Sequence, residues 1–116
     1  MACAICVLPG QKGYFMRFRS LLKKLAMADG VHPRFLHAAL IAKGKSVFGM
    51  GTNIGYKHAE VNAIEHARTS RPDLAGATLY TLMVRSRSGS LGNGSPCQEC
   101  MDAIASAGIR KVVVYL

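Results

Sequence analysis

The sequence predicts an α/β domain of three layers, with a mixed β-sheet between helices. From residue 35 onward, apolar segments of strand length alternate with segments of helical periodicity. The first two strands are separated only by Lys43-Gly44-Lys45, which is short enough for a hairpin. The later strands are separated by predicted helices, and strands joined in this way run parallel through right-handed crossovers. We therefore expect one domain over residues 1–116, with an N-terminal β-hairpin followed by parallel strands.

The first half of the chain predicts one helix and the hairpin. Residues 1–13 are expected to form an opening segment, closed by Pro9-Gly10 and Gly13. Residues 14–28 predict a helix, because apolar side chains recur every three or four positions, at Phe18, Leu21, Leu22, Leu25 and Ala28. Residues 35–42 are almost all apolar, as a buried strand is, and residues 46–51 return as the hairpin partner.

The second half predicts two helices, each followed by a strand. Residues 58–70 form the first helix, which ends at Arg71-Pro72 because the residue before proline disfavours helical backbone. Residues 77–84 then form a central strand. Pro96 suits the first position of the next helix, and residues 112–116 form the fourth strand.

Residues 85–95, with the sequence Arg-Ser-Arg-Ser-Gly-Ser-Leu-Gly-Asn-Gly-Ser, are the one low-complexity stretch. Loops of this length in compact domains tend to be functional. The stretch leads directly into a pair of cysteines, so we expect a flexible loop that closes over a site. The alternative is a tolerated surface insertion.

The charge of the chain indicates an anionic partner or substrate. Fifteen Lys and Arg oppose six Asp and Glu, which gives a formal net charge of +9. The basic residues gather at two places: before the hairpin, at Lys12, Arg17, Arg19, Lys23 and Lys24, and at Arg85 and Arg87. A basic, solvated surface without a specific partner is the alternative interpretation.

Hydropathy and cysteine usage favour a cytoplasmic (intracellular) protein without a membrane span. No apolar run reaches the roughly 18 residues that indicate a transmembrane helix. The apolar first residues have no basic stretch before them, so they do not indicate a signal peptide. Cys3 and Cys6 form one C-x-x-C pair, which we expect to be small apolar residues; a disulfide or an adventitious metal site is the alternative.

The motif around which the chain is organised is split into His58-Ala59-Glu60 and Pro96-Cys97-Gln98-Glu99-Cys100. A catalytic zinc takes three protein ligands in a tetrahedral arrangement and keeps the fourth position open. His58, Cys97 and Cys100 can supply those ligands. Cys97 and Cys100 are spaced i, i+3, so both thiolates lie on one face of a helical turn. Glu60 lies close enough to handle protons at the site. His32 and His37 lack such partners and are expected to be loop or core histidines.

This H-x-E…P-C-x-x-C pattern resembles that of the cytidine deaminase superfamily, and the resemblance covers residues 35–116. It implies a cytidine deaminase-like fold, Zn²⁺ as the cofactor and Glu60 as the catalytic proton shuttle of a hydrolytic deaminase. Family members usually add a fifth strand, whereas this chain stops at the fourth predicted strand. An exposed sheet edge left there would permit a homo-oligomer.

The resemblance also implies substrate contacts. Asn53 matches a family residue that hydrogen-bonds the substrate's sugar, although Asn53 would equally stabilise a turn. Tyr56 would stack on the base or cover the start of the helix. Ala59 and Ser95 are expected at the base, Ser95 together with the amides near Cys97.

Three functions remain open at this point. The motif Ser-Pro-Cys-x-x-Cys and the +9 charge resemble those of enzymes that convert cytosine to uracil in single-stranded DNA or RNA. In that case Arg85 and Arg87 would follow the phosphate backbone. The chain departs from those enzymes in having no Trp. The first alternative is a deaminase of free cytidine, deoxycytidine or their nucleotides. The second is a non-catalytic, basic nucleic-acid-binding module with a structural zinc.

Overall fold

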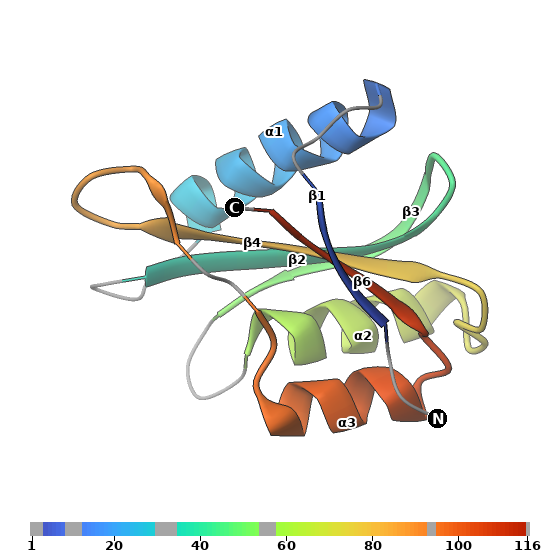
Figure 1. Cartoon of the computed structure of the whole chain (residues 1–116). Helices are drawn as coiled ribbons and strands as arrows, with labels where there is room; N and C mark the ends of the chain where they lie inside the picture. The colour runs from blue at the N-terminus through green and yellow to red at the C-terminus, as the bar shows by residue number, and fades with distance from the viewer. Residues whose placement is uncertain (1–3, 9–12, 30–34, 54–57, 93–94, 116) are drawn as a thin grey trace.

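The computed structural model describes residues 4–8, 13–29, 35–53, 58–92 and 95–115, which form six strands and three helices (Figure 1). In chain order these are β1 (Ala4–Leu8), α1 (Gly13–Asp29), β2 (Phe35–Lys43), β3 (Ser46–Thr52), α2 (Ala59–Ser70), β4 (Thr78–Arg85), β5 (Leu91–Gly92), α3 (Gln98–Ser106) and β6 (Lys111–Tyr115). None of the described helices is both long enough and apolar enough to cross a bilayer.

The sheet has the strand order β1-β6-β4-β2-β3, with the short β5 paired to β4. β2 is antiparallel to both of its neighbours, whereas β4, β6 and β1 are parallel. Gly44, with φ +60°, allows the tight turn between β2 and β3. α1 covers one face of the sheet, and α2 and α3 cover the other (Figure 1). The predicted three-layer fold with a mixed sheet is therefore confirmed.

The N-terminal segment differs from its prediction, because residues 4–8 form a strand. β1 pairs in parallel with β6, from Ala4 opposite Lys111 to Leu8 opposite Tyr115. The segment Ala-Ile-Cys-Val-Leu is apolar and partly β-branched, as a strand next to a sheet core is. The expectation of an unpaired edge at β6 is therefore wrong, because β1 occupies that position.

The expected loop over residues 85–95 is also partly a strand. Arg85 ends β4, and Leu91–Gly92 return as β5 opposite Val84 and Met83. The turn is closed by two backbone bonds of 2.9 Å, in which Gly89 donates to the Arg85 carbonyl and Arg85 donates to the Ser90 carbonyl. Gly89 has φ +72°, which a glycine adopts without strain. The hairpin was not predicted because residues 85–95 are mostly polar residues and glycines, which are typical of loops.

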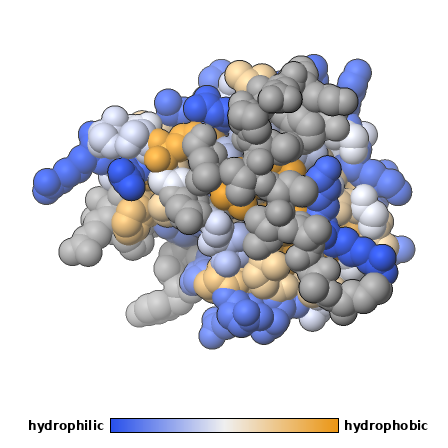
Figure 2. Space-filling view, in the orientation of Figure 1, coloured by the Kyte–Doolittle hydropathy of each residue, from blue (hydrophilic) through white to orange (hydrophobic). Residues whose placement is uncertain are grey.

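Two apolar clusters fill the space between the layers. On the α1 side, Phe18, Leu22 and Ala26 are buried, and the Phe18 ring meets Tyr80 edge-on at 4.9 Å. Leu21 and Ala28 of the predicted apolar stripe are exposed instead, so the buried face is rotated toward Ala26. Figure 2 shows hydrophilic residues mainly around the outline of the molecule and apolar residues toward the middle of the view.

The close approach of α2 to β3 fixes the start of α2. A Cβ atom added to Gly51 would lie 2.5 Å from the Ala63 amide nitrogen and 2.7 Å from the Ala59 carbonyl oxygen, so only glycine fits. The Asn62 side chain also donates a 2.6 Å hydrogen bond to the Thr52 carbonyl at the end of β3. The first turn of α2 is therefore held at the end of β3 by a close backbone approach and a side-chain hydrogen bond.

Candidate metal centre

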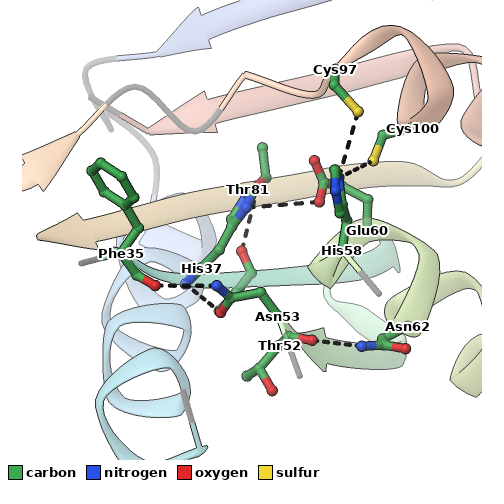
Figure 3. Close-up of polar contacts among 11 residues, drawn as sticks. Phe35, His37, Thr52, Asn53, His58, Glu60, Asn62, Thr81, Cys97 and Cys100 are labelled. Carbon is green, nitrogen blue, oxygen red and sulfur yellow. Dashed lines mark hydrogen bonds and ion pairs between the residues drawn. The ribbon is translucent and has the colours of Figure 1, made fainter. Parts of the chain in front are cut away.

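Three side chains from the beginnings of two helices converge on one point (Figure 3). The Nδ1 atom of His58 lies 3.0 Å from the sulfur of Cys100 and 3.5 Å from that of Cys97. All three ligand atoms lie within 4.8 Å of one another. Around a tetrahedral zinc with bonds of its usual length, a nitrogen and a sulfur ligand are about 3.6 Å apart. The three residues therefore fit a zinc ion.

The local backbone explains why these side chains are available. His58 and Cys97 are the N-cap residues of α2 and α3, in extended conformation, and neither side chain caps its own helix. The Cys97 carbonyl accepts a 2.9 Å bond from the Met101 amide, which is the first backbone hydrogen bond of α3. Pro96 lies before the N-cap and not at the first helical position that we predicted. The free amides and dipole of a helix N-terminus favour anionic thiolates.

The ligands differ in their exposure. Cys100 is buried, with 1% of its surface exposed, whereas His58 and Cys97 face solvent. Burial raises the pKa of the Cys100 thiol, and the charge of Glu60 raises it further. A metal ion that binds here must displace the Cys100 proton, and the exposed His58 and Cys97 lie on the side that is open to solvent.

Glu60 lies beside the three ligands as a buried carboxylate, only 1% exposed, in the first turn of α2. Its Oε1 atom has no hydrogen-bond partner among the described residues. A buried polar atom without a partner is costly, so it calls for an explanation. Within the described part of the chain, Glu60 therefore presents a buried carboxylate oxygen without a hydrogen bond next to the three metal ligands.

The structure places His37 beside Glu60, a contact that the sequence did not predict. Its Nδ1 atom lies 3.8 Å from Oε1 of Glu60, and its Nε2 atom lies 2.5 Å from the hydroxyl of Thr81 (Figure 3). Burial lowers the pKa of His37, which outweighs the raising effect of Glu60, so the ring is neutral near pH 7. Within β2, His37 alternates with Ala39 and Ile41, which face α2, and that alternation was the available signal.

Comparison with known proteins identifies the family. Residues 10–116 match the family model described as the cytidine and deoxycytidylate deaminase zinc-binding region. The chain belongs to this family. The resemblance to zinc deaminases is therefore confirmed, and the family's zinc-binding character agrees with the three ligands found here.

Two curated relatives of the deaminase family are the deoxycytidylate deaminases of the enterobacteria phages T2 and T4. Each is 39% identical over 56 residues, which cover 48% of this chain but 24% and 23% of the relatives. The chain thus spans about a quarter of the length of these relatives.

Two solved structures share the fold of this deaminase-family chain. The first is the diaminohydroxyphosphoribosylaminopyrimidine deaminase/reductase of Thermotoga maritima, with 29% identity and a TM-score of 0.66, over 87% of this chain and 29% of that one. The second is the dCMP deaminase of cyanophage S-TIM5, with 19% identity and a TM-score of 0.57, over 87% and 93% of the two chains. The second similarity is one of fold alone.

The side chain of Asn53, which we expected at the substrate's sugar, makes two hydrogen bonds to the backbone of β2. Its Oδ1 atom accepts a 3.0 Å bond from the His37 amide, and its Nδ2 atom donates a 3.1 Å bond to the Phe35 carbonyl. These bonds continue the β2–β3 pairing beyond Thr52, so the side chain stabilises the sheet and not the turn that was the alternative. The amide retains a second hydrogen and a second lone pair, so a sugar contact stays a prediction.

The other predicted substrate residues lie around the deaminase-family motif or outside the described ranges. Ala59 is buried beside Glu60, and Ser95 is exposed two residues before Cys97. Arg85 and Arg87 are exposed on the β4–β5 hairpin. Tyr56, Cys3, His32 and Lys12 lie outside the described residues, and Cys6 is placed in β1 opposite Val113.

Proposed function

We propose that this chain hydrolyses the amino group of cytosine in a free nucleotide, with deoxycytidylate as the model substrate. The observation that carries the proposal is the buried Oε1 atom of Glu60, without a hydrogen-bond partner among the described residues, next to three convergent metal ligands. A zinc that merely held two helices together would have no use for a buried acid at this place.

The residues divide the chemistry between them. His58, Cys97 and Cys100 would hold zinc, which supplies Lewis acidity and brings the pKa of a water molecule toward about 7. Glu60 accepts a proton from the water that adds to C4 of the base. It passes that proton to the ring nitrogen N3. It then takes the remaining proton of the new hydroxyl group at C4 and gives it to the departing amine, so that water is consumed and ammonia and the uracil nucleotide are released.

The comparisons support a phosphorylated substrate. The phage relatives are named for deoxycytidylate, and the Thermotoga enzyme is named for a phosphoribosylaminopyrimidine. Both names describe a pyrimidine attached to a phosphorylated sugar. An anionic substrate also agrees with the net charge of +9.

The single-stranded polynucleotide that the sequence favoured has weaker support. That expectation rested largely on basic residues, and four of them, Arg17, Arg19, Lys23 and Lys24, belong to α1. α1 covers the face of the sheet opposite to α2 and α3, which carry the metal ligands (Figure 1). These charges are therefore poorly placed to guide a strand into the site.

Arg85 is the better candidate for a phosphate contact. Along β4, Leu79 packs in the α2-side cluster and Thr81 meets His37, so Arg85 faces the same side by alternation. It lies four residues beyond Thr81, which is about 13 Å along a strand. Its Nε atom is 3.7 Å from the point where a Cβ on Gly92 would stand, so the side chain lies over β5. We assign Arg85 to the phosphate of the nucleotide.

One set of incubations tests the proposal. Zinc-loaded protein would be offered deoxycytidylate, deoxycytidine and a single-stranded oligonucleotide with one cytosine, and uracil products and ammonia would be measured. We expect the highest kcat/KM with deoxycytidylate, and no turnover by Glu60→Gln although its zinc content equals that of the wild type. Product from the oligonucleotide alone would reject the free-nucleotide substrate, and full activity of Glu60→Gln would reject the mechanism.

A further inference from the structure

We propose that His37 and Thr81 are positioning residues that orient the carboxylate of Glu60, an inference that rests on the proposed function. The three side chains come from β2, β4 and α2 and form a row that leads from the core to the metal ligands (Figure 3). Thr81 holds the imidazole, and the imidazole faces the carboxylate.

The His37 ring has little freedom to move. Its Nε2 atom is 2.5 Å from the Thr81 hydroxyl, which is itself buried. Asn53 holds the backbone of His37 by two hydrogen bonds. Its side-chain Oδ1 atom accepts from the His37 backbone amide, and its backbone amide donates to the His37 carbonyl at 3.2 Å. The ring therefore presents its Nδ1 atom to Glu60 in a fixed direction.

Glu60 needs such a partner. The last torsion of a glutamate side chain is broad and selects no orientation by itself. No described residue makes a hydrogen bond to its Oε1 atom, and the His37 Nδ1 atom at 3.8 Å is within ion-pair range of it. This separation is longer than a hydrogen bond, and catalytic contacts of this kind commonly tighten when substrate binds. His37 therefore sets the direction in which the carboxylate points.

The tautomer of the neutral ring follows from the charge that faces Nδ1. The Thr81 hydroxyl has one hydrogen and two neighbours, His37 Nε2 at 2.5 Å, where either group can donate, and the Ala38 carbonyl at 3.4 Å. If Thr81 donates to Nε2, the ring proton lies on Nδ1 and points at the Glu60 carboxylate, which is attractive. The opposite tautomer would place a lone pair against the carboxylate, and burial makes that repulsion expensive.

Substitutions on β2 and β4 distinguish positioning from packing. Thr81→Val keeps the side-chain shape and removes the hydroxyl, and Thr81→Ser restores it. His37→Leu removes the group that faces Glu60, whereas His37→Asn keeps an N–H near the position of Nδ1. Met83→Leu is the matched control, because Met83 is the cross-strand neighbour of His37 in β4.

We expect Thr81→Val and His37→Leu to lower kcat for deoxycytidylate about 10- to 100-fold, the usual effect of removing a supporting hydrogen bond. The KM and the zinc content should stay at the wild-type values, and Thr81→Ser and His37→Asn should recover part of the lost kcat. Met83→Leu should behave as the wild type. Wild-type kcat in both Thr81→Val and His37→Leu, or a loss confined to KM, would overturn the inference.

A second measurement does not depend on turnover. Nitrogen-15 NMR of the His37 ring in the zinc-loaded protein should show a protonated Nδ1 and an unprotonated Nε2, and Thr81→Val should disturb this assignment. A ring protonated at Nε2 would overturn the proposal. If Glu60→Gln is inactive while the His37 and Thr81 variants are fully active, this inference fails alone; if Glu60→Gln is active, the proposed function fails.

Discussion

The Nδ1 atom of His58 lies 3.0 Å from the sulfur of Cys100, although 42 positions separate the two residues in the sequence. Each residue belongs to the beginning of a different helix, and both helices pack on the same face of the sheet. The zinc site is therefore a product of the tertiary fold. Zinc binding therefore depends on the packing of α2 and α3 as well as on the ligands themselves.

Removal of any one ligand should abolish stable zinc binding. His58→Ala, Cys97→Ala and Cys100→Ala each leave two protein ligands, and we expect zinc affinity to fall by more than the roughly 100-fold seen for supporting residues. Zinc content after dialysis and competition with a coloured chelator measure this. Cys6→Ser is the matched control, because β1 places Cys6 opposite Val113. Wild-type zinc affinity in Cys97→Ala would contradict the assigned ligand set.

Arg85 should distinguish a nucleotide from a nucleoside. For Arg85→Ala we expect the KM for deoxycytidylate to rise about tenfold, as for the loss of one charge-assisted hydrogen bond at an accessible site. The KM for deoxycytidine should not change, because that substrate has no phosphate. Arg87→Ala is the control from the same hairpin. Equal effects of Arg85→Ala on both substrates would remove Arg85 from the phosphate site.

His37 should make the folded state sensitive to mild acid. Burial lowers the pKa of His37 below its usual 6.5, and unfolding restores the usual value. Between the two values the unfolded chain binds more protons, so the free energy of unfolding falls as the pH drops below about 6.5, by at most about 1.4 kcal/mol per pH unit. Above that pH the contribution is constant.

Urea titrations from about pH 5 to 8 measure this dependence, with a chelator present so that zinc loss does not contribute. The His37→Asn variant lacks the titrating group, so its free energy of unfolding should fall less steeply over the same interval. Identical slopes for the wild type and His37→Asn would mean that His37 binds protons equally in both states.

Gly51 should be intolerant of any side chain. An added Cβ would meet the backbone of α2 at 2.5 Å, and backbone cannot yield as a flexible side chain can. We expect Gly51→Ala to reduce stability by about 1–3 kcal/mol, the usual result of overpacking, and to weaken zinc binding because α2 carries His58. Thermal unfolding and zinc titration measure the two effects. Gly44→Asn is the control, because that turn has open space and a φ that asparagine tolerates.

The metal ligands were predictable because each half of the motif is local. His58 and Glu60 share one turn of α2, and Cys97 and Cys100 share one turn of α3, so spacing alone places each pair. The meeting of the two halves depends on the fold, and the alternation of strands and helices indicated that fold.

The parts that sequence reasoning missed depend on pairing between distant segments. β1 has five residues without alternating polarity and stands directly before Pro9-Gly10, so only its partner β6 reveals it as a strand. Alternation along β2 places His37 on the α2 side, but only the register of β2 with β4 and its packing against α2 bring it to Thr81 and Glu60. Residues that act through neighbours carry little local signal.

The pairing of β1 with β6 also has a consequence for biosynthesis. Ala4 lies opposite Lys111, a separation of 107 positions, so β1 must wait for a partner that is synthesised much later. Contacts between such distant segments form slowly, because the entropy lost in closing a long loop comes before the contacts that stabilise it. While the chain emerges from the ribosome, the outermost strand has no partner, and the sheet gains its final hydrogen bonds only when translation of β6 is complete.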